Sequence, residues 1–549
     1  MQRVCKTEWL MKGVWEMAMK ERPEVITLDD GSKYWEHEYE SFYLKTYVPA
    51  NDLNGQVNNY GFKAPLLLIF EETRQGRDEA VEFARKTGLE DIAASYDASV
   101  LFIYPTAEGG WKNAPGNLYA DVIAEVRMDV DYSEGLDEWH DFFAREFKGY
   151  FIRGAKFRAD IYSYGESADY VARNLLKTQD GIFLWGPGEI TPAVCSMERL
   201  TVIPDVQRKD IAVLSVSNSD EINKAFEGCE NLLIKDQADY RDDFISFVRR
   251  FKMWCGHVEM EPIFEEMNMT EEPGSVVVKT SPNNFGKYKD QPEHTVGYFA
   301  YYNNGIFDKG PAPLLIGCHG GGDSSMYLTF VAGFWRVAHD HDILYVALDD
   351  HLNITPTEII DVIEHLKTKY SIDEKRIYIG GFSMGSGKTQ DMFQEYPEVF
   401  AGLLPCSALF PVKDNMFSHP LGEINQDKPV PLFYSGGEDS PLPELPSQAD
   451  SCLDRFKYFA QVNRLKKRDR IEALKFDDKA DWEDPFWGIP GDRTEKYYDE
   501  ERDAYLTVNY YDSDDGVCRT AFGSVSGQQH ECRHHSVENA WQFVSKFTR

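Results

Sequence analysis

The sequence lacks the run of ~18 apolar residues that a membrane-spanning helix needs, and it is poor in basic residues. Lys and Arg number 58 against 92 Asp and Glu, which gives the 549-residue chain a net charge of −34. A field of that sign repels phosphate backbones and anionic lipids, so we expect neither nucleic acid nor a membrane surface as a partner. Residues 1–23 show no signal-peptide pattern, and we expect a cytoplasmic protein.

Cysteine is also scarce, and the nine residues show no spacing typical of a metal site. They are scattered singly, so we expect mostly free thiols in a reducing compartment. Hydrophobic residues make up 42% and aromatic residues 14% of the chain, which excludes a disordered protein. Because one core rarely serves more than about 250–300 residues, the length predicts two domains.

The two halves of the chain resemble each other at three landmarks that occur in the same order. Two of them are strand-like apolar segments and the third is a helix-like segment with Phe-Val-x-x-Phe. The matched segments are residues 64–69 with 312–317, 160–167 with 376–383, and 244–251 with 540–547. We therefore predict two copies of one fold, in domains 1–270 and 271–549.

Strands and helices alternate in the C-terminal half. Short apolar runs at 314–317, 343–348 and 376–379 predict buried strands, and residues 355–370 have the apolar spacing of a helix. A second helix is expected to begin near Met384. This alternation predicts an α/β domain with a mainly parallel sheet that is flanked by helices.

The third of these strands is followed directly by Gly-Phe-Ser-Met-Gly, which fits the G-x-S-x-G pattern of a nucleophilic serine. Glycines at 381 and 385 permit the tight turn that exposes the hydroxyl of Ser383. The chain continues as Gly-Ser-Gly-Lys-Thr, which is how a phosphate-binding P-loop ends. That motif needs glycine at position 382, which is Phe382, so we reject nucleotide binding.

A second glycine-rich turn, at His319, Gly320, Gly321 and Gly322, follows the strand at 314–317. Consecutive glycines let backbone N–H groups point inward, where they can bind the oxyanion of a tetrahedral intermediate. The N–H of Met384 is expected to be the second donor. We expect no metal or organic cofactor.

The acid of a Ser–acid–His triad is expected to follow the strand after the Ser383 turn. Residues 431–435 read as that strand and end in Gly-Gly-Glu-Asp. We predict Asp439 as the acid, with Glu438 as the alternative.

Three histidines lie near the C-terminus. His530 follows a predicted strand at 520–525 through a short loop, whereas His534 and His535 fall close to the closing helix. Only one imidazole can bridge the serine and the acid. We predict His530 as the base.

Residues 370–385 resemble the polyhydroxybutyrate-depolymerase and feruloyl-esterase-like branch of the α/β-hydrolases, a branch related to the catalytic domain of prolyl oligopeptidases. The resemblance covers the last half of the chain. It implies a serine esterase in which Ser383, Asp439 and His530 form the triad beside an oxyanion site at 319–322. Together with the similarity of the two halves, it predicts two tandem α/β-hydrolase-like domains. A prolyl-oligopeptidase-type peptidase and a non-catalytic binding or scaffold protein are the alternatives.

The segment at 440–515 is longer than this fold needs, and we expect an insertion over the carboxyl edge of the sheet. It carries Trp482 and Trp487. Their rings either bind an apolar acyl or phenolic group of the substrate or form a small core under a long loop.

The first copy lacks parts of this chemistry. Ser167 aligns with Ser383, but Glu71, Glu72 and Thr73 stand opposite the glycine-rich turn. Carboxylates there oppose an oxyanion. No histidine occurs between His140 and His257. We expect an inactive copy that shapes the catalytic cleft or contributes a dimer contact.

Overall fold

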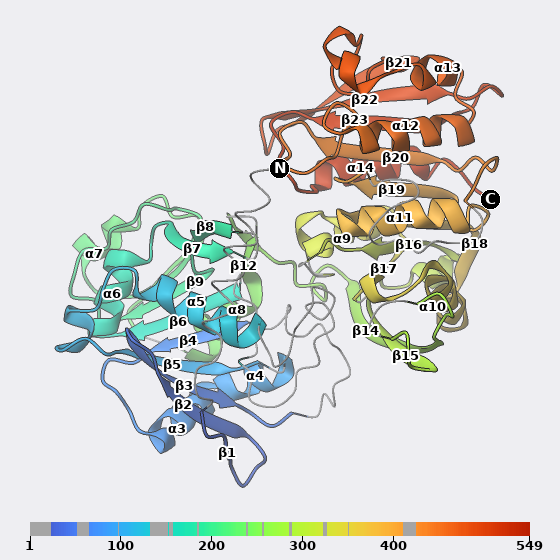
Figure 1. Ribbon diagram of the computed structural model, residues 1–549. Coiled ribbons are helices and arrows are strands. Elements are labelled where there is room, and N and C mark those ends of the chain that lie inside the picture. Colours follow the sequence, from blue (N-terminus) through green and yellow to red (C-terminus); the bar gives the residue numbers. More distant parts are fainter. Residues whose placement is uncertain are drawn as a thin grey trace. The chain divides into compact units, whose positions relative to one another are not determined.

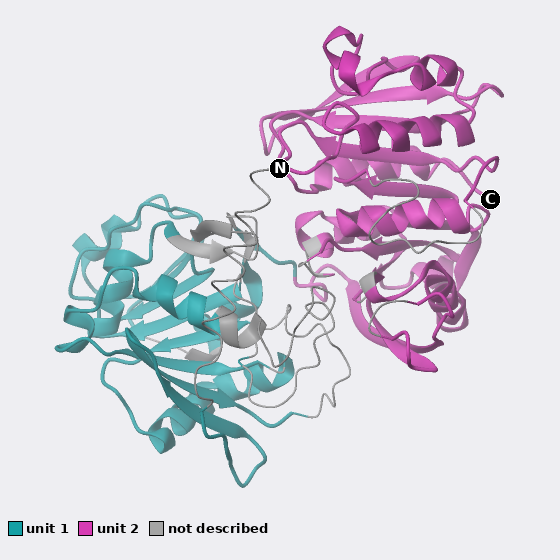
Figure 2. Cartoon of the chain, viewed as in Figure 1, with its two compact units in different colours: residues 1–262 teal, residues 263–549 magenta. Residues whose placement is uncertain are grey.

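The chain forms two compact units, residues 1–262 and 263–549, in a computed structural model (Figures 1 and 2). The two units divide after Pro262, whereas the predicted boundary after residue 270 falls inside the first strand of the second unit, β14 (Met269–Lys279). The structure describes residues 23–51, 65–96, 98–131, 152, 158–183, 186–237, 240–254, 257–284, 288–321, 325, 327–349, 351–409 and 424–549. The segment at 1–22 and Gly322 therefore lie outside the described residues.

Unit 2 is built on one ten-stranded sheet in the order β14-β15-β17-β16-β18-β19-β20-β23-β22-β21. The strands from β17 to β23 in that order pair in parallel, and the two strands at each edge pair antiparallel to their neighbours. The remaining strand bounds are β15 (Glu293–Asn303), β16 (Ala312–Cys318), β17 (Leu344–Leu348), β18 (Ile372–Phe382), β19 (Gly402–Cys406), β20 (Leu432–Gly437), β21 (Arg493–Asp499), β22 (Ala504–Asp512) and β23 (Cys518–Val525).

Helices cover both faces of this sheet, which buries the central strands completely and explains their continuous apolar sequences. Helix α10 begins where the sequence predicts it, because Thr355 and Glu358 form a reciprocal capping box around Pro356. The helices are α9 (Phe334–Asp340), α10 (Pro356–Lys369), α11 (Met384–Glu395), α12 (Asp450–Val462), α13 (Arg468–Glu472) and α14 (His534–Val544).

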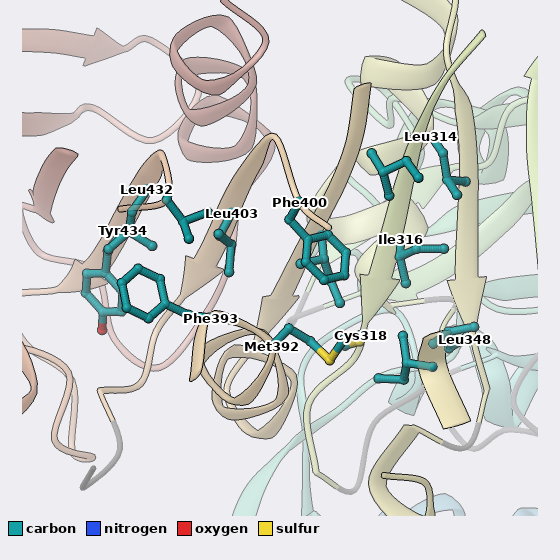
Figure 3. Close-up of a cluster of buried hydrophobic side chains, with 14 of the residues drawn as sticks. Leu314, Ile316, Cys318, Leu348, Met392, Phe393, Phe400, Leu403, Leu432 and Tyr434 are labelled. Atoms are coloured by element: carbon teal, nitrogen blue, oxygen red, sulfur yellow. The ribbon is translucent and has the colours of Figure 1, made fainter. Parts of the chain in front are cut away.

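The larger core of unit 2 lies between the sheet and helices α10, α11 and α12. Figure 3 shows part of it, where side chains of β16, β19 and β20 face Met392 and Phe393 of α11. On the other face, Trp541 of α14 packs on Tyr378 at 4.9 Å between ring centroids, and Phe334 of α9 packs on Tyr345 at 5.4 Å. The two layers hold β18, and the turn after it, in a fixed position.

The segment at 440–515 is not the insertion that we expected over the edge of the sheet. Helix α12 packs into the main core, and β22 and β21 extend the sheet beyond β23. The segment is therefore an integral part of the fold.

Unit 1 repeats this topology in a nine-stranded sheet with the order β1-β2-β3-β5-β4-β6-β9-β10-β11. Strands β2 to β11 in this order correspond one by one to β14 to β23 of unit 2, with the same parallel and antiparallel pairings. The predicted class, an α/β protein with two mainly parallel mixed sheets, is confirmed. Its sheet strands are β1 (Ile26–Thr27), β2 (Lys33–Glu38), β3 (Phe42–Val48), β4 (Leu66–Phe70), β5 (Val100–Pro105), β6 (Ala159–Tyr164), β9 (Val194–Glu198), β10 (Ala212–Val216) and β11 (Leu232–Lys235).

Five helices of unit 1 lie between these strands in the sequence, α8 follows the last of them, and two hairpins lie outside the sheet among the described residues. Among the described residues, no helix is both long and apolar enough to cross a membrane. The helices are α3 (Arg77–Thr87), α4 (Leu89–Tyr96), α5 (Leu118–Asp131), α6 (Glu166–Asn174), α7 (Asp220–Ala225) and α8 (Ile245–Arg250). The hairpins are β7 (Gln179–Phe183) with β8 (Gly186–Ile190) and β12 (Phe251–Trp254) with β13 (His257–Met260).

Candidate active site

Ser383 lies in the turn between β18 and α11. Its backbone has φ 53° and ψ −113°, a conformation that residues other than glycine rarely adopt. The flanking glycines are required by close contacts. A Cβ at Gly385 would lie 1.9 Å from the carbonyl oxygen of Cys318, and one at Gly381 would lie 2.3 Å from the carbonyl oxygen of Gly385. The G-x-S-x-G pattern therefore reports a strained turn that presents the serine hydroxyl above the carboxyl end of the sheet.

The imidazole of His530 reaches this hydroxyl. Its Nε2 lies 2.8 Å from Ser383 Oγ, within hydrogen-bonding distance. The ring packs beside Phe382, with 5.0 Å between the centroids. Of the three candidate histidines, the structure brings His530 to the serine, whereas His534 begins α14.

The carboxylate that meets His530 is Glu444, and the prediction of Asp439 is corrected. Glu444 Oε1 lies 2.6 Å from His530 Nδ1. Asp439 is exposed to solvent, and the alternative, Glu438, accepts a hydrogen bond from Ser524 Oγ at 2.8 Å. The predicted loop after β20 is right, but the acid lies further along it.

The path of this loop explains why the nearer carboxylates do not reach the imidazole. A Cβ at Gly437 would lie 2.3 Å from the carbonyl oxygen of Gln528, so β20 ends in direct contact with the backbone of the histidine loop. The chain then turns outward at Asp439 and returns with Glu444 fully buried. The Glu444 carboxylate is held by the N–H of Gly437 at 2.5 Å and by Ser440 Oγ at 2.6 Å.

The glycine-rich turn after β16 lies against the Ser383 turn. A Cβ at Gly321 would lie 1.9 Å from Met384 Sδ, and one at Gly320 would lie 3.4 Å from the Cβ of Ser383. Met384 is the first residue of α11, so its N–H has no acceptor within the helix. The glycine-rich turn and the start of α11 therefore lie in contact beside Ser383.

The side chain of His319 is buried and contacts the backbone of this turn. Its Nδ1 lies 2.7 Å from the carbonyl oxygen of Gly320 and its Nε2 lies 2.8 Å from that of Asp349. His319 therefore contacts protein backbone through both ring nitrogens, and its contribution to the site is structural.

Trp487 lies in the core of unit 2 and not at its surface. It is 1% exposed and packs among Phe456, Phe522 and Tyr434, with ring centroids 5.4, 4.8 and 5.8 Å away. Trp482 is half-buried against the same core. The structure thus favours the second of the two alternatives that the sequence left open, in which the rings pack in a core. The aromatic partners come from α12 and β23, and no local sequence pattern reveals these contacts.

The rejected P-loop motif has a structural role. Lys388 is buried inside unit 2, and its Nζ donates to the carbonyl oxygen of Ile354 at 2.7 Å. Thr389 Oγ1 donates to the carbonyl oxygen of Gly385 within α11 at 2.9 Å. Neither side chain is available to a phosphate.

Three features occur together in unit 2: the order of strands around a central β18, the strained turn at Ser383 directly before a helix, and the chain order serine, acid, histidine. Unit 2 has the α/β-hydrolase fold. Within this fold, Glu444 occupies the usual loop of the acid, after the second strand beyond the serine turn. The sequence interpretation had missed the first of these strands, β19, because Pro405 lies inside it and proline is rare in central strands.

Comparison with known proteins places esterases among the relatives of this α/β-hydrolase. A bifunctional acetylxylan esterase/xylanase of Neocallimastix patriciarum is 24% identical over 190 residues, which are 35% of this chain and 23% of that enzyme. The chain thus matches less than a quarter of that relative's length. No protein-family model matches the chain.

Solved structures of esterases also overlap with about half of the chain. An acetyl xylan esterase from Aspergillus awamori matches 49% of this chain and 98% of its own, at 12% identity and a TM-score of 0.32. A ferulic acid esterase matches 51% and 99%, at 14% identity and a TM-score of 0.31. At scores this low, the assignment of the α/β-hydrolase fold depends on the strand order and the Ser383 turn.

In unit 1 the turn that corresponds to Ser383 holds Gly165, with φ 62° and ψ −127° between β6 and α6. The predicted alignment of Ser167 with Ser383 is therefore shifted by two residues. Ser167 lies in the first turn of α6, is buried, and donates to the carbonyl oxygen of Phe70 at 2.6 Å. Because the two turns have different sequences, only their backbone conformations reveal the correct register.

The space above Gly165 is filled by a carboxylate. A Cβ at Gly165 would lie 1.9 Å from Glu72 Oε1, and Glu72 Oε2 pairs with Arg199 at 2.7 Å. Glu71, one residue earlier, is buried in an ion pair with Lys45. At the carboxyl edge of this sheet, ion-paired carboxylates therefore lie where unit 2 has Ser383 and its glycine-rich turn.

Proposed function

We propose that unit 2 is a serine hydrolase that cleaves carboxylic esters through an acyl-enzyme intermediate, with Ser383 as nucleophile, His530 as base and Glu444 as acid. The observation that supports this most is the unbroken hydrogen-bonded line from the serine hydroxyl through the imidazole to a buried carboxylate, at 2.8 and 2.6 Å. Serine is a weak nucleophile until such a base removes its proton.

In the first step, Ser383 Oγ attacks the ester carbonyl carbon while His530 Nε2 takes its proton. Glu444 accepts a hydrogen bond from Nδ1 and stabilises the imidazolium that forms. The carbonyl oxygen becomes negative and is bound by the N–H of Met384 and by an N–H of the turn at Gly320 and Gly321.

The imidazolium then gives its proton to the departing alcohol, which leaves the acyl group on Ser383. Water, activated by the same imidazole, hydrolyses this acyl-enzyme and releases the acid. Each donor to the oxyanion contributes on the order of 10²–10³ in kcat. The residues of this chain suffice for every step.

An ester rather than an amide is the proposed substrate because the relative found by sequence is described as an acetylxylan esterase joined to a xylanase. We extend only the acetyl ester to this chain, as the first acyl group to test. The match covers 23% of that enzyme, and its xylanase activity is not extended to this chain.

Unit 1 is proposed to be catalytically inactive. A glycine stands in the place of the nucleophile, the Glu72 carboxylate occupies the space of the reacting carbonyl, and residues 141–256 contain no histidine. All hydrolysis by the full chain is therefore assigned to unit 2.

The test is labelling with a fluorophosphonate together with hydrolysis of p-nitrophenyl acetate. Ser383→Ala is expected to abolish the labelling and to lower kcat on the order of 10⁴ or more. Ser167→Ala, in the motif of the other unit, is the matched control and is expected to change neither. Absence of labelling of the wild-type chain would favour the binding or scaffold alternative, and faster cleavage of amino-acyl anilides than of esters would favour a peptidase.

A further inference from the structure

The loop that carries His530 is anchored on each side of the histidine by a hydrogen bond to its backbone. On one side, the N–H of Asp439 in the acid loop donates to the carbonyl oxygen of Gln528 at 3.0 Å. On the other side, Ser407 Oγ donates to the carbonyl oxygen of Glu531 at 2.6 Å. Ser407 directly follows β19, the strand next to β18 in the sheet. The histidine loop is therefore held between the acid loop and the end of β19.

Ser407 is itself fixed in place. It is buried, and its backbone has φ 54°, in the left-handed region that residues other than glycine rarely adopt. Its N–H donates to the carbonyl oxygen of Ser435 on β20 at 2.8 Å. The carbonyl oxygen of the preceding residue, Cys406, accepts a hydrogen bond from the N–H of Ser383 at 2.9 Å. Cys406 and Ser407 thus link the Ser383 turn to the His530 loop.

Two other bonds of Glu531 lie within the histidine loop. Gln528 Nε2 donates to the Glu531 carbonyl oxygen at 3.0 Å, and Arg533 Nε donates to the Glu531 carboxylate at 2.7 Å. Both donors belong to the same segment of chain, so these bonds set the shape of the loop. The Ser407 hydroxyl belongs to a different element, and its bond fixes the position of the loop relative to the sheet.

Unit 1 shows which part of this arrangement belongs to the fold. Arg199 directly follows β9 and has φ 57°, and the N–H of Gly165 donates to the carbonyl oxygen of Glu198 at 3.0 Å. These residues therefore correspond to Ser407, Ser383 and Cys406 of unit 2. The side chain of Arg199 pairs with Glu72 at 2.7 Å. Both units share the left-handed backbone, and the buried hydroxyl is the feature that distinguishes the unit with the histidine.

We propose that Ser407 is a positioning residue for ester hydrolysis, whose hydroxyl holds the His530 loop so that the imidazole stays within reach of Ser383. This inference rests on the proposed function. His530 acts as base or acid both when the acyl-enzyme forms and when water cleaves it, so a displaced ring slows both steps. A displacement of about 1 Å can lower activity on the order of 10². Because the anchor from Asp439 remains, removal of the Ser407 hydroxyl is expected to lower kcat about tenfold.

The experiment compares Ser407→Ala with Ser513→Ala in the full chain. Ser513 is a matched control, because it is also buried and its Oγ donates to a distant backbone carbonyl, that of Asn463, at 2.7 Å. It follows the end of β22 that pairs with the start of β23, at the edge of the sheet opposite to the site. Ser407→Gly is a second variant, since it also lacks the hydroxyl but adopts φ 54° without strain.

Both variants at position 407 are expected to hydrolyse p-nitrophenyl acetate with about tenfold lower kcat and with KM within about twofold of the wild type. Labelling by a fluorophosphonate is expected to be slower but to reach the same final extent, because every chain is folded and only the base is misplaced. A variant that was merely unstable would instead reach a lower final extent. Ser513→Ala is expected to change none of these values.

Hydrogen exchange of the amides at 526–533, followed by mass spectrometry, measures the loop without any substrate. Ser407→Ala is expected to exchange there at least about threefold faster than the wild type, and Ser513→Ala at the wild-type rate. Exchange at the wild-type rate, a kcat within about twofold of the wild type, or a loss of activity matched by a lower extent of labelling would each overturn the proposal. A wild-type chain that neither reacts with the fluorophosphonate nor cleaves esters would contradict the proposed function, and the exchange rates would still decide whether Ser407 holds the loop.

Discussion

Replacing the buried carboxylate with its amide, Glu444→Gln, separates the acid that the structure identifies from the one that the sequence predicts. The side chain keeps its size, and Glu444 is 0% exposed, so the change acts on hydrogen bonding. Glu444 Oε1 serves both His530 Nδ1 and Ser440 Oγ, and Oε2 serves the N–H of Gly437. A glutamine keeps one acceptor oxygen, which cannot satisfy all three donors.

Two orientations of the amide are available, and both impair the triad. If the amide nitrogen faces His530, it donates to Nδ1, the ring proton moves to Nε2, and the base can no longer accept the proton of Ser383. If the oxygen faces the ring, the amide nitrogen points at the N–H of Gly437 and no negative charge stabilises the imidazolium. Loss of the correct tautomer costs on the order of 10⁴ in kcat, which is about 5 kcal/mol of transition-state stabilisation.

The assay is steady-state hydrolysis of p-nitrophenyl acetate by the full chain, with thermal unfolding as a check that the variant folds. Asp439→Asn and Glu438→Gln are the matched controls, and each is expected to keep kcat within about twofold because exposed or differently bonded carboxylates contribute little. A Glu444→Gln enzyme within tenfold of the wild type, or an equally inactive Asp439→Asn enzyme, would refute the assignment of Glu444.

Three further predictions concern stability. Ser383→Gly is expected to abolish hydrolysis and yet to raise the free energy of unfolding of unit 2 by about 1–2 kcal/mol, because glycine adopts φ 53° and ψ −113° without strain; a less stable variant in urea denaturation would argue against a strained turn. Trp487→Ala is expected to lower that free energy by about 3–5 kcal/mol through loss of core packing, whereas Trp487→Phe keeps KM for p-nitrophenyl acetate within about twofold; a large rise in KM would return Trp487 to the substrate site. Burial and the Asp391 carboxylate raise the pKa of Glu395 to about 8 from its ordinary 4.5. Between these values the unfolded chain loses a proton that the folded chain keeps, so stability falls as the pH rises from 4.5 to 8. Glu395→Gln is expected to flatten this decline and to stabilise unit 2 by about 1–3 kcal/mol at pH 8, and an unchanged pH profile of the unfolding midpoint would contradict this account.

Local signals were sufficient for much of this protein. Alternating strands and helices and the apolar central strands predicted the α/β class, and the three matched segments of the two halves predicted the repeat of the fold. The turn at Ser383 and the glycines beside it were also readable, because a strained backbone and a close approach each restrict the residue type at a fixed position. His530 was identified from its place after a strand near the C-terminus.

Tertiary structure alone decided which carboxylate contacts His530. Which carboxylate reaches His530 depends on the path of the loop after β20, and hydrogen bonds require a placement within a few tenths of an ångström that no local pattern encodes. Trp487 is a core residue because its aromatic partners come from elements distant in the chain. The alignment of the two units, in which Gly165 corresponds to Ser383, follows from the similar backbone angles of these two residues. A local sequence pattern predicts the backbone conformation of neighbouring residues. Contacts between distant segments form only when the sheet brings their loops to the same edge, so a local pattern does not predict them.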